Sequence, residues 1–403
     1  AIGQTFPIYF IIIALGIGLS IATTSIIANS IGENKISKSS NIFCQSLGLA
    51  VFVSIIISIF GIYFGSSILE SINNDQNTLN LSSEYMNVIY LGSVIILLLM
   101  VSNSCLSALG DTKSYRNVLI FSFFLNIILN PVLISGKFLG FDVFIPLGIK
   151  GIAIATILSQ FIGLLYLLYK ISKTEIYNYF KKKYLIPKIK SIVEISIQGI
   201  PASIGLMMIA LGSYILLYFV SSYGNNAIAG FASAGRYEQL LFLPLLGLST
   251  AVTSIVGQNL GANKPNRILE TYIKAIKTGV IILSIVALFL FFSAELSMRL
   301  FTDDEKVIFY GTMYLKIWAF GFPAFPLFFI ANATFQGLKK AVIVMYMAIL
   351  RFVITPILIV TLINNFIKED YIYMFIGLTL MHWIIGILYF KYSLKKIKRL
   401  ISI

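Results

Sequence analysis

Eleven long apolar stretches run through this chain, and they limit its possible folds more than any other feature. Each is about twenty residues or longer, which lets an α-helix cross the ~30 Å hydrocarbon core of a bilayer. The sequence therefore predicts an all-α polytopic membrane protein. The stretches lie near 5–30, 42–66, 84–109, 117–135, 148–169, 192–220, 226–259, 270–293, 309–337, 341–363 and 372–391.

Composition excludes a soluble protein. The 403 residues are 58% hydrophobic and 11% charged, with a mean hydropathy of +0.92, whereas soluble domains carry about a quarter charged residues. The formal net charge of +14 comes mostly from loops between apolar stretches, so it indicates membrane topology and not nucleic-acid binding. Two cysteines and one histidine, without a CxxC motif, argue against a structural metal site or a disulfide framework.

The cations lie mostly on one side of the predicted membrane. Of the 30 Lys and Arg residues, 22 fall in the breaks after odd-numbered stretches, at the edge of the eighth stretch or in the C-terminal tail. Because cation-rich loops remain in the cytoplasm, we expect a multi-pass protein of the plasma (inner) membrane with a cytoplasmic C-terminus.

One phrase of the sequence occurs twice. "GLSIATTSIIANSIGENK" begins at Gly18 and "GLSTAVTSIVGQNLGANK" begins at Gly247, 229 positions later, and the two agree at ten of eighteen positions. Each copy ends an apolar stretch and enters a basic loop, so both run in the same direction. Such repeats are related by an axis along the membrane normal, and substrate sites form where the halves meet. The sequence therefore predicts a duplicated helical bundle.

The repeat also predicts the domain organisation. The stretch at 192–220 precedes the second copy, and subtracting the offset places its counterpart ahead of Ala1. We therefore expect two six-helix bundles related by a pseudo-twofold axis, with the first helix missing and eleven spans present. The expected divisions are an N-terminal lobe at 1–170, a cytoplasmic linker at 171–191 and a C-terminal lobe at 192–403.

Several motifs resemble those of the multidrug and toxic compound extrusion family over the whole chain. They are the two repeated phrases, "ALGDTK", "NIILNPVLI" followed by "GIKGIAIATILSQ", and "AGRYEQLLFLPLLGLSTAVTSIVGQNLGANK". The resemblance implies two lobes around a cleft that opens alternately to each side. It also implies efflux of amphipathic, often cationic compounds in exchange for Na⁺ or H⁺. The expected partners are a small-molecule substrate and membrane lipid, without nucleic acid, in a monomer that needs no cofactor besides the coupling ion.

Arg236 and Glu238 are charges inside an apolar stretch. A charge in hydrocarbon costs about 3 kcal/mol or more unless it has a partner, water or a function. The two residues differ by about 200° around a helix, so they do not form an i,i+4 pair. We predict that Glu238 takes part in coupling to an ion or substrate; the alternative is a structural anchor. Arg236 joins it as a candidate binding residue.

Asn126 and Asn130 are predicted to share one helix face because they lie four residues apart. Pro131 removes a backbone donor and so frees a carbonyl. In one branch of the family that the chain resembles, the residue before this proline is an aspartate of a cation or proton site. An amide there does not titrate, but its oxygen can ligate Na⁺. Thr156 matches a threonine of the same family site, so these three residues are a candidate Na⁺ site; the alternative is hydrogen bonding between helices.

The sequence indicates a binding role less strongly for three other residues. Asn332 ends a stretch from Phe325 that corresponds to a family segment with acidic residues, and we include it among the candidate binding residues. Arg351 is expected to pair with a carbonyl group or with Glu238. His382 titrates near neutral pH when unperturbed, but a lone histidine in a helix more often serves packing.

A flippase and a membrane enzyme are the alternatives to ion-coupled efflux. A flippase for a lipid-linked saccharide is the alternative transporter, and it would need a basic cavity for a diphosphate; the intramembrane cations here are few. A membrane enzyme is not expected, because no HExxH motif and no cluster of carboxylates lies within the stretches. No Walker motif is present either.

Overall fold

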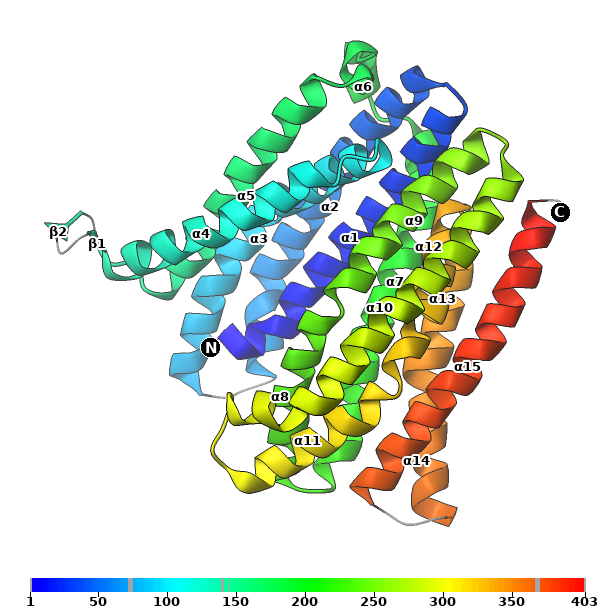
Figure 1. Ribbon diagram of the computed structural model, residues 1–403. Helices are drawn as coiled ribbons and strands as arrows, with labels where there is room; N and C mark the ends of the chain where they lie inside the picture. The colour runs from blue at the N-terminus through cyan, green and yellow to red at the C-terminus, as the bar shows by residue number, and fades with distance from the viewer. Residues whose placement is uncertain (1, 72–74, 139–140, 144, 367–369, 402–403) are drawn as a thin grey trace. The chain divides into compact units, whose positions relative to one another are not determined.

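The fold is almost entirely α-helical (Figure 1). The computed structural model describes residues 2–71, 75–138, 141–143, 145–366 and 370–401. Within these residues, nine helical segments are long and apolar enough to cross a membrane, and two bent helix pairs raise the number to eleven. The predicted all-α polytopic fold is confirmed.

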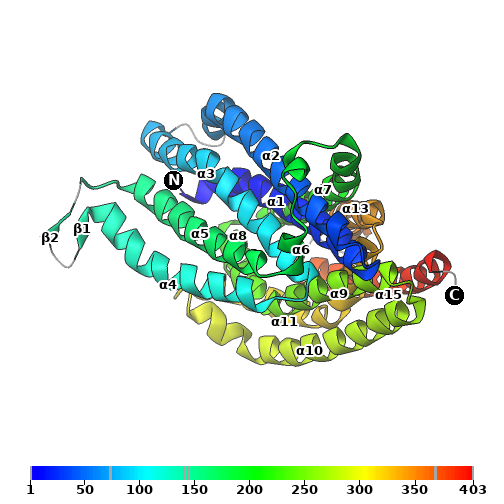
Figure 2. The ribbon, with the colours of Figure 1, turned by 90° about the horizontal axis from the view of Figure 1, so that it is seen from above.

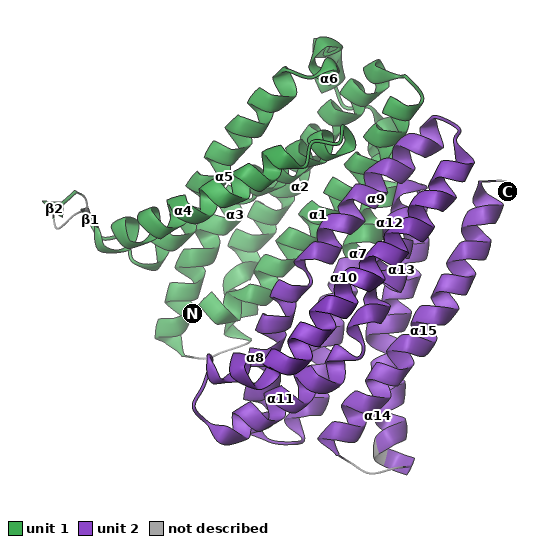
Figure 3. Ribbon diagram, viewed as in Figure 1, with its two compact units in different colours: residues 1–203 green, residues 204–403 purple. Residues whose placement is uncertain are grey.

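The chain forms two compact units, residues 1–203 and 204–403 (Figure 3). Each unit has its own cluster of buried apolar side chains. The first unit contains α1 (Ile2–Gly32), α2 (Ile36–Glu70), α3 (Gln76–Ala108), α4 (Lys113–Ser135), α5 (Ile149–Ser172), α6 (Glu175–Asn178), a 3₁₀ turn η1 (Lys182–Leu185) and the first part of α7 (Ile189–Ser221).

The second unit begins within α7. Its further elements are α8 (Asn225–Leu241), α9 (Leu243–Gly261), α10 (Pro265–Arg299), α11 (Glu305–Ala319), the 3₁₀ turn η2 (Phe322–Ala324), α12 (Phe325–Gly337), α13 (Ala341–Ile349), a π-helical segment η3 (Leu350–Ile354), α14 (Thr355–Phe366) and α15 (Tyr371–Leu400). The sequence predicts that the second lobe begins at residue 192, whereas the second compact unit begins at Ile204. The π-helical segment has no counterpart in the sequence analysis.

A short hairpin joins α4 to α5. Its strands, β1 (Lys137–Phe138) and β2 (Phe141–Asp142), are antiparallel, and Lys137 pairs with Asp142 in register. Gly136 ends α4 in the left-handed conformation, with φ of 71°, which glycine adopts without steric penalty. No sequence pattern described above predicts these strands.

The predicted linker is anchored to α2. Gln45 of α2 donates from Nε2 to the carbonyl oxygens of Tyr184 at 2.6 Å and Ile186 at 2.8 Å. Its Oε1 accepts from the backbone N–H of Lys188 at 2.7 Å. A single buried amide thus satisfies three backbone groups of the connection, which fixes the path of the chain from α6 to α7.

Helices α4 and α5 lie side by side, as Figures 1 and 2 show from two directions. Gly151 of α5 permits their close approach, because a Cβ atom there would lie 2.7 Å from the carbonyl of Leu133 in α4. The carbonyl is backbone and cannot move aside as a flexible side chain can. The polar residues of both helices are therefore held close together.

Two spans of the second unit are broken. Helices α8 and α9 meet at an angle of 46°, and the pair formed by α11 and α12 meets at 43°. Pro244 lies just after the first break, and Pro323 lies in η2 at the second; proline lacks the N–H that would continue a helix. At the second break the indole N–H of Trp383 donates to the carbonyl of Phe320 at 2.8 Å. That bond satisfies a carbonyl group that the break exposes.

Candidate functional site

Glu238 of α8 lies at the centre of a polar cluster inside the second unit. Its Oε2 accepts a hydrogen bond from the hydroxyl of Tyr314, and its Oε1 accepts from the indole N–H of Trp318 at 2.8 Å. Tyr314 and Trp318 lie four residues apart on α11, so one helix face supplies both donors. The carboxyl group is thus held between two neutral donors.

Arg351 supplies the positive charge of this cluster. Its side chain is 8% exposed, and the charge interacts favourably with Glu238. Its guanidinium nitrogen Nη2 lies 3.3 Å from Nδ1 of His382 in α15. The guanidinium carbon also lies 3.8 Å from the ring centroid of Phe328, a cation–π contact. The sequence suggests a carbonyl group or Glu238 as the partner of Arg351. The direct neighbours in the structure are His382 and aromatic rings.

Arg351 belongs to the π-helical segment η3. Pro356 follows it and lacks an N–H, so the regular hydrogen-bond ladder is interrupted. The hydroxyl of Thr355 instead donates to the carbonyl of Leu350 at 2.8 Å. Gly212 of α7 passes this segment closely, since a Cβ atom there would lie 2.5 Å from the carbonyl of Phe352. Such π-helical segments frequently occur at functional sites.

His382 is buried, with 5% of its surface exposed. Its ring lies 4.5 Å from the ring of Phe325 and 5.6 Å from that of Trp318, measured between centroids. Aromatic side chains thus enclose the ionisable groups of the cluster and keep water away from them. Besides packing, the role expected for a lone hydrogen-bonded histidine, His382 contacts Arg351.

Arg236 and Asn332 are not brought together with Glu238. Arg236 is exposed, as the 200° separation around the helix requires. Asn332 of α12 accepts through Oδ1 from the hydroxyl of Tyr389 at 2.8 Å. Tyr389 lies seven residues beyond His382 on α15, about 10 Å along the helix at 1.5 Å per residue.

A second polar cluster lies between α4 and α5 in the first unit. Asn126 donates from Nδ2 to the carbonyl of Ser122 at 2.8 Å and to the hydroxyl of Ser159 at 3.0 Å. Thr156 is one helical turn from Ser159, and its hydroxyl donates to the carbonyl of Ile152 at 3.0 Å. Asn126 thus reaches Ser159 across the α4–α5 interface, and Thr156, also predicted as part of the Na⁺ site, lies one turn from that contact on α5.

Two buried amide oxygens of α4, Oδ1 of Asn126 and Oδ1 of Asn130, lack hydrogen-bond donors among the described residues. Oε1 of Gln160 in α5 also lacks a donor there, but this side chain makes a hydrogen bond with Tyr9 of α1. An unsatisfied buried oxygen costs about 1–3 kcal/mol. Amide and hydroxyl oxygens suit hard cations. Over the part of the chain that the structure describes, no group of three or more His, Cys, Asp or Glu side chains could hold a metal ion, so a cation here would be bound by neutral oxygens.

Tyr314, Trp318 and Gln160 are absent from the sequence-based candidate residues. Tyr314 and Trp318 have one local signal, an i,i+4 pair of amphipathic aromatics within an apolar stretch. That spacing cannot name Glu238 as the partner, because the packing of α8 against α11 decides it. Gln160 adjoins the predicted Thr156 by one helical turn, so the face of α5 could have suggested it.

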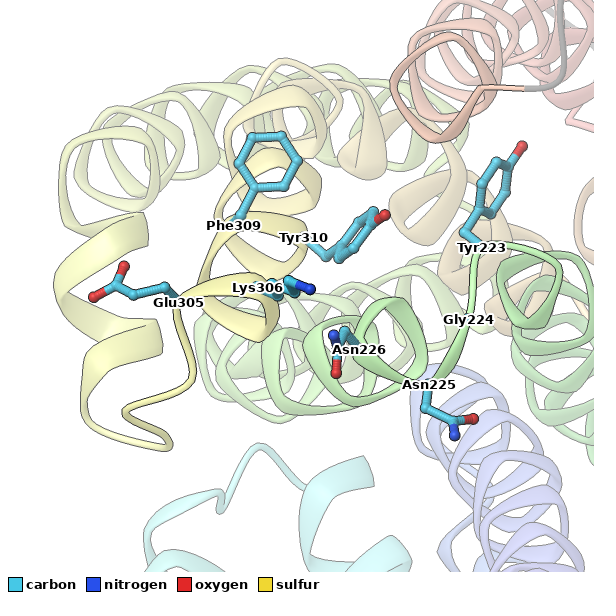
Figure 4. A pocket seen from close by; sticks show the side chains of 8 residues that line it. All are labelled: Tyr223, Gly224, Asn225, Asn226, Glu305, Lys306, Phe309 and Tyr310. Carbon is cyan, nitrogen blue, oxygen red and sulfur yellow. The ribbon is translucent and has the colours of Figure 1, made fainter.

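A polar cavity of about 710 Å³ lies where α8 and α11 begin (Figure 4). Asn225, Asn226 and Lys306 line it. The carboxylate of Glu305, also in the lining, is held by Arg299 at 2.7 Å. Glu238 lies thirteen residues after Asn225, about 20 Å along α8, so this cavity is separate from the cluster around Glu238.

Comparison with known proteins gives consistent matches. The MatE family model matches residues 1–132 and 201–361. NorM of Thermotoga maritima, a probable multidrug resistance protein, is 28% identical over 83% of this chain and 70% of its own length. YoeA of Bacillus subtilis, also a probable multidrug resistance protein, is 25% identical over 84% of this chain and 73% of its own length.

Solved structures match over the whole fold. A crystal structure of MATE in complex with MaL6 gives a TM-score of 0.91 at 25% identity and covers 100% of this chain and 89% of its own. The outward-facing conformation of a multidrug resistance MATE family transporter gives 0.92 at 26% identity, covering 99% and 88%. The helical architecture described above is therefore that of these structures.

Proposed function

The chain belongs to the MatE family, the multidrug and toxic compound extrusion transporters, and on this premise we propose that it is a secondary active efflux transporter. It exchanges Na⁺ or H⁺ for amphipathic, often cationic organic compounds by alternating access. Its relatives named as multidrug resistance proteins support this activity. The many cations on one side of the spans support a plasma (inner) membrane orientation with the C-terminus in the cytoplasm.

The surroundings of Glu238 carry this proposal, because they accommodate the carboxyl group both with and without a proton. A tyrosine hydroxyl can donate or accept a hydrogen bond, whereas an indole N–H can only donate. The ionised carboxylate accepts from Tyr314 and Trp318, as in the structure. When Glu238 takes up a proton on Oε2, its new O–H donates to the oxygen of Tyr314, while Oε1 still accepts from Trp318. Glu238 is therefore the proposed proton-exchanging residue.

Because Arg351 is positively charged, the net charge of the cluster depends on whether Glu238 is protonated. Its guanidinium group is buried among Phe328, Phe325 and His382, where electrostatic interactions are stronger than in water. The ionised carboxylate interacts favourably with this charge, whereas the protonated one does not. Protonation of Glu238 thus changes the net charge of the cluster. A change of that kind can shift a two-state equilibrium between conformations.

The oxygen cluster of the first unit is the proposed Na⁺ site. Asn126, Asn130 and Thr156 would supply neutral oxygens. Na⁺ would be a transported ion here and not a resident cofactor. The two clusters lie in different units, so their contributions can be separated by mutation.

Glu238→Gln tests the proposal in proteoliposomes loaded with a fluorescent lipophilic cation. Glutamine keeps the size of the side chain but does not titrate, so proton-driven efflux should fall at least about ten-fold, the effect of losing a general acid–base step or a charge-assisted bond. Glu270→Gln is the matched control, because Glu270 is an exposed carboxylate paired with Lys274 on α10. Unchanged efflux in Glu238→Gln, at equal protein content, rules out Glu238 as the coupling residue.

The flippase alternative receives less support. A diphosphate needs several cations in one pocket. Arg236 is exposed and Arg351 is enclosed by aromatic rings, while Lys316 lines a groove that contains neither of them. We therefore keep the antiporter as the single proposed function.

A further inference from the structure

An apolar groove of about 1030 Å³ runs along the second unit between α10, α11 and α15. Leu288 and Phe292 line it from α10, and Leu380 lines it from α15. Lys316 of α11 is its one ionisable lining residue. Lys316 lies two residues from both Tyr314 and Trp318, about 200° around the helix. The groove therefore lies on the face of α11 opposite the cluster around Glu238.

Lys316 is a cation whose neighbour is an aromatic ring and not a carboxylate. It makes no ion pair or hydrogen bond with any residue that the structure describes; its ammonium nitrogen lies 6.0 Å from the ring centroid of Phe291. It is the twelfth residue of α11, about 16 Å along the helix from Glu305. An uncompensated lysine at such depth in a span costs about 2.5–3.5 kcal/mol. An anion bound in the groove would offset that cost.

Thr379 of α15 provides a second polar group in the same groove. The residue is 6% exposed, and its Oγ1 has no hydrogen-bond partner among the described residues. The neighbouring indole of Trp383 is already engaged with the carbonyl of Phe320. The groove thus offers one ammonium group and the hydroxyl residues Ser284 and Thr379 within a largely apolar lining.

We propose that this groove binds a fatty acid, with its carboxylate between Lys316 and Thr379 and its acyl chain against Leu288, Phe292 and Leu380. A carboxylate accepts hydrogen bonds from both groups, and the acyl chain is stabilised by about 0.8 kcal/mol per buried methylene. The phosphate of a phospholipid remains at the headgroup level of the bilayer, whereas Lys316 lies deep along its helix. This depth favours a single-chain amphiphile.

The two tryptophans of the chain make a direct test possible. Trp383 lines the groove, while Trp318 faces Glu238. In a Trp318→Phe background, the full-length chain in phosphatidylcholine nanodiscs reports from the groove alone. Titration with dibromostearic acid should quench Trp383 saturably. Lys316→Met should raise the half-saturating concentration about ten-fold or more, as expected for one charge-assisted bond.

Three further measurements complete the test. Lys316→Arg should retain binding because it keeps the charge. Lys306→Met, on the same helix outside the groove, should leave the titration unchanged. The methyl ester of dibromostearic acid has no charge, so its half-saturating concentration should be about ten-fold or more above that of the acid. Equal quenching by acid and ester, or equal titrations of Lys316→Met and its parent, would overturn the proposal. Tighter binding of brominated phosphatidylglycerol than of the acid would replace the fatty acid with a phospholipid and would likewise overturn it.

Discussion

At the scale of single residues, the two donors to Glu238 differ in what they can do. The hydroxyl of Tyr314 can reverse the direction of its hydrogen bond, whereas the indole of Trp318 cannot. Under the proposed function, Tyr314 is the partner that adapts when a proton arrives, and Trp318 keeps the carboxyl group in place. This difference assigns separate roles to two side chains on one face of α11.

Tyr314→Phe removes the adaptable partner. A lost hydrogen bond to a charged group costs about 1.5–3 kcal/mol, so proton-driven efflux should fall about ten-fold or more. Initial rates in proteoliposomes measure this. Tyr310→Phe, one turn earlier on α11, is the control, since its hydroxyl makes no hydrogen bond with the described residues. Equal rates for the Tyr314 and Tyr310 variants would contradict the role given to Tyr314.

The residues of the two clusters could be predicted from sequence only in part. Glu238 could be predicted because a carboxylate in an apolar stretch is energetically costly without a partner or a function. Asn126 and Asn130 could be predicted from their i,i+4 spacing beside Pro131. Tyr314 and Trp318 do not stand out, because amphipathic aromatics are common in apolar helices. Their role depends on the packing of α8 against α11, about 80 positions apart in the chain.

At the scale of helices, the ends of the spans are set by local hydrogen bonds. Asp111 precedes α4, where its Oδ2 accepts from the hydroxyl of Ser114 at 2.6 Å and its Oδ1 accepts from the backbone N–H at 3.0 Å. Partial burial alone would raise the pKa of Asp111, but the hydrogen bonds from Ser114 outweigh it and hold this pKa below its usual value. The ionised carboxylate therefore stabilises the start of α4.

Asp111→Asn tests this contribution through its pH dependence. A lowered pKa in the folded state stabilises the protein above the unfolded value of about 3.9, and the gain is lost as pH falls through the folded pKa. The variant should have a lower thermal unfolding midpoint in detergent at pH 7, and the difference should shrink below pH about 4. Asp303→Asn, in an exposed connection, controls for the change of charge. A difference independent of pH would contradict the assignment.

The helical elements were more predictable than their irregularities. The eleven apolar stretches correspond to the spans because hydrophobic length alone identifies them. The 46° and 43° bends were not predicted, although Pro244 and Pro323 lie beside them. Proline inside an apolar stretch is compatible with a straight, kinked or broken helix, and packing decides between these. The bond from Trp383 to the carbonyl of Phe320 joins residues 63 positions apart, which no local pattern reveals.

At the scale of the whole molecule, each unit contains one of the two polar clusters described above. The cluster of the first unit consists of neutral oxygens, and that of the second contains Glu238, Arg351 and His382. The repeated phrases at Gly18 and Gly247 predict two related halves, but the two clusters differ in chemistry. The proposed function thus gives the duplicated framework two kinds of ion chemistry, one suited to Na⁺ and one to H⁺.

Ion-coupled efflux is the central claim, and one measurement tests it most directly. Proteoliposomes that contain the full-length protein and a fluorescent lipophilic cation are given both gradients, and the Na⁺ and H⁺ gradients are then dissipated in turn. We predict that efflux stops when the coupling gradient is removed and continues when the other is removed. Efflux that persists at the same rate after both gradients have been dissipated would contradict the account.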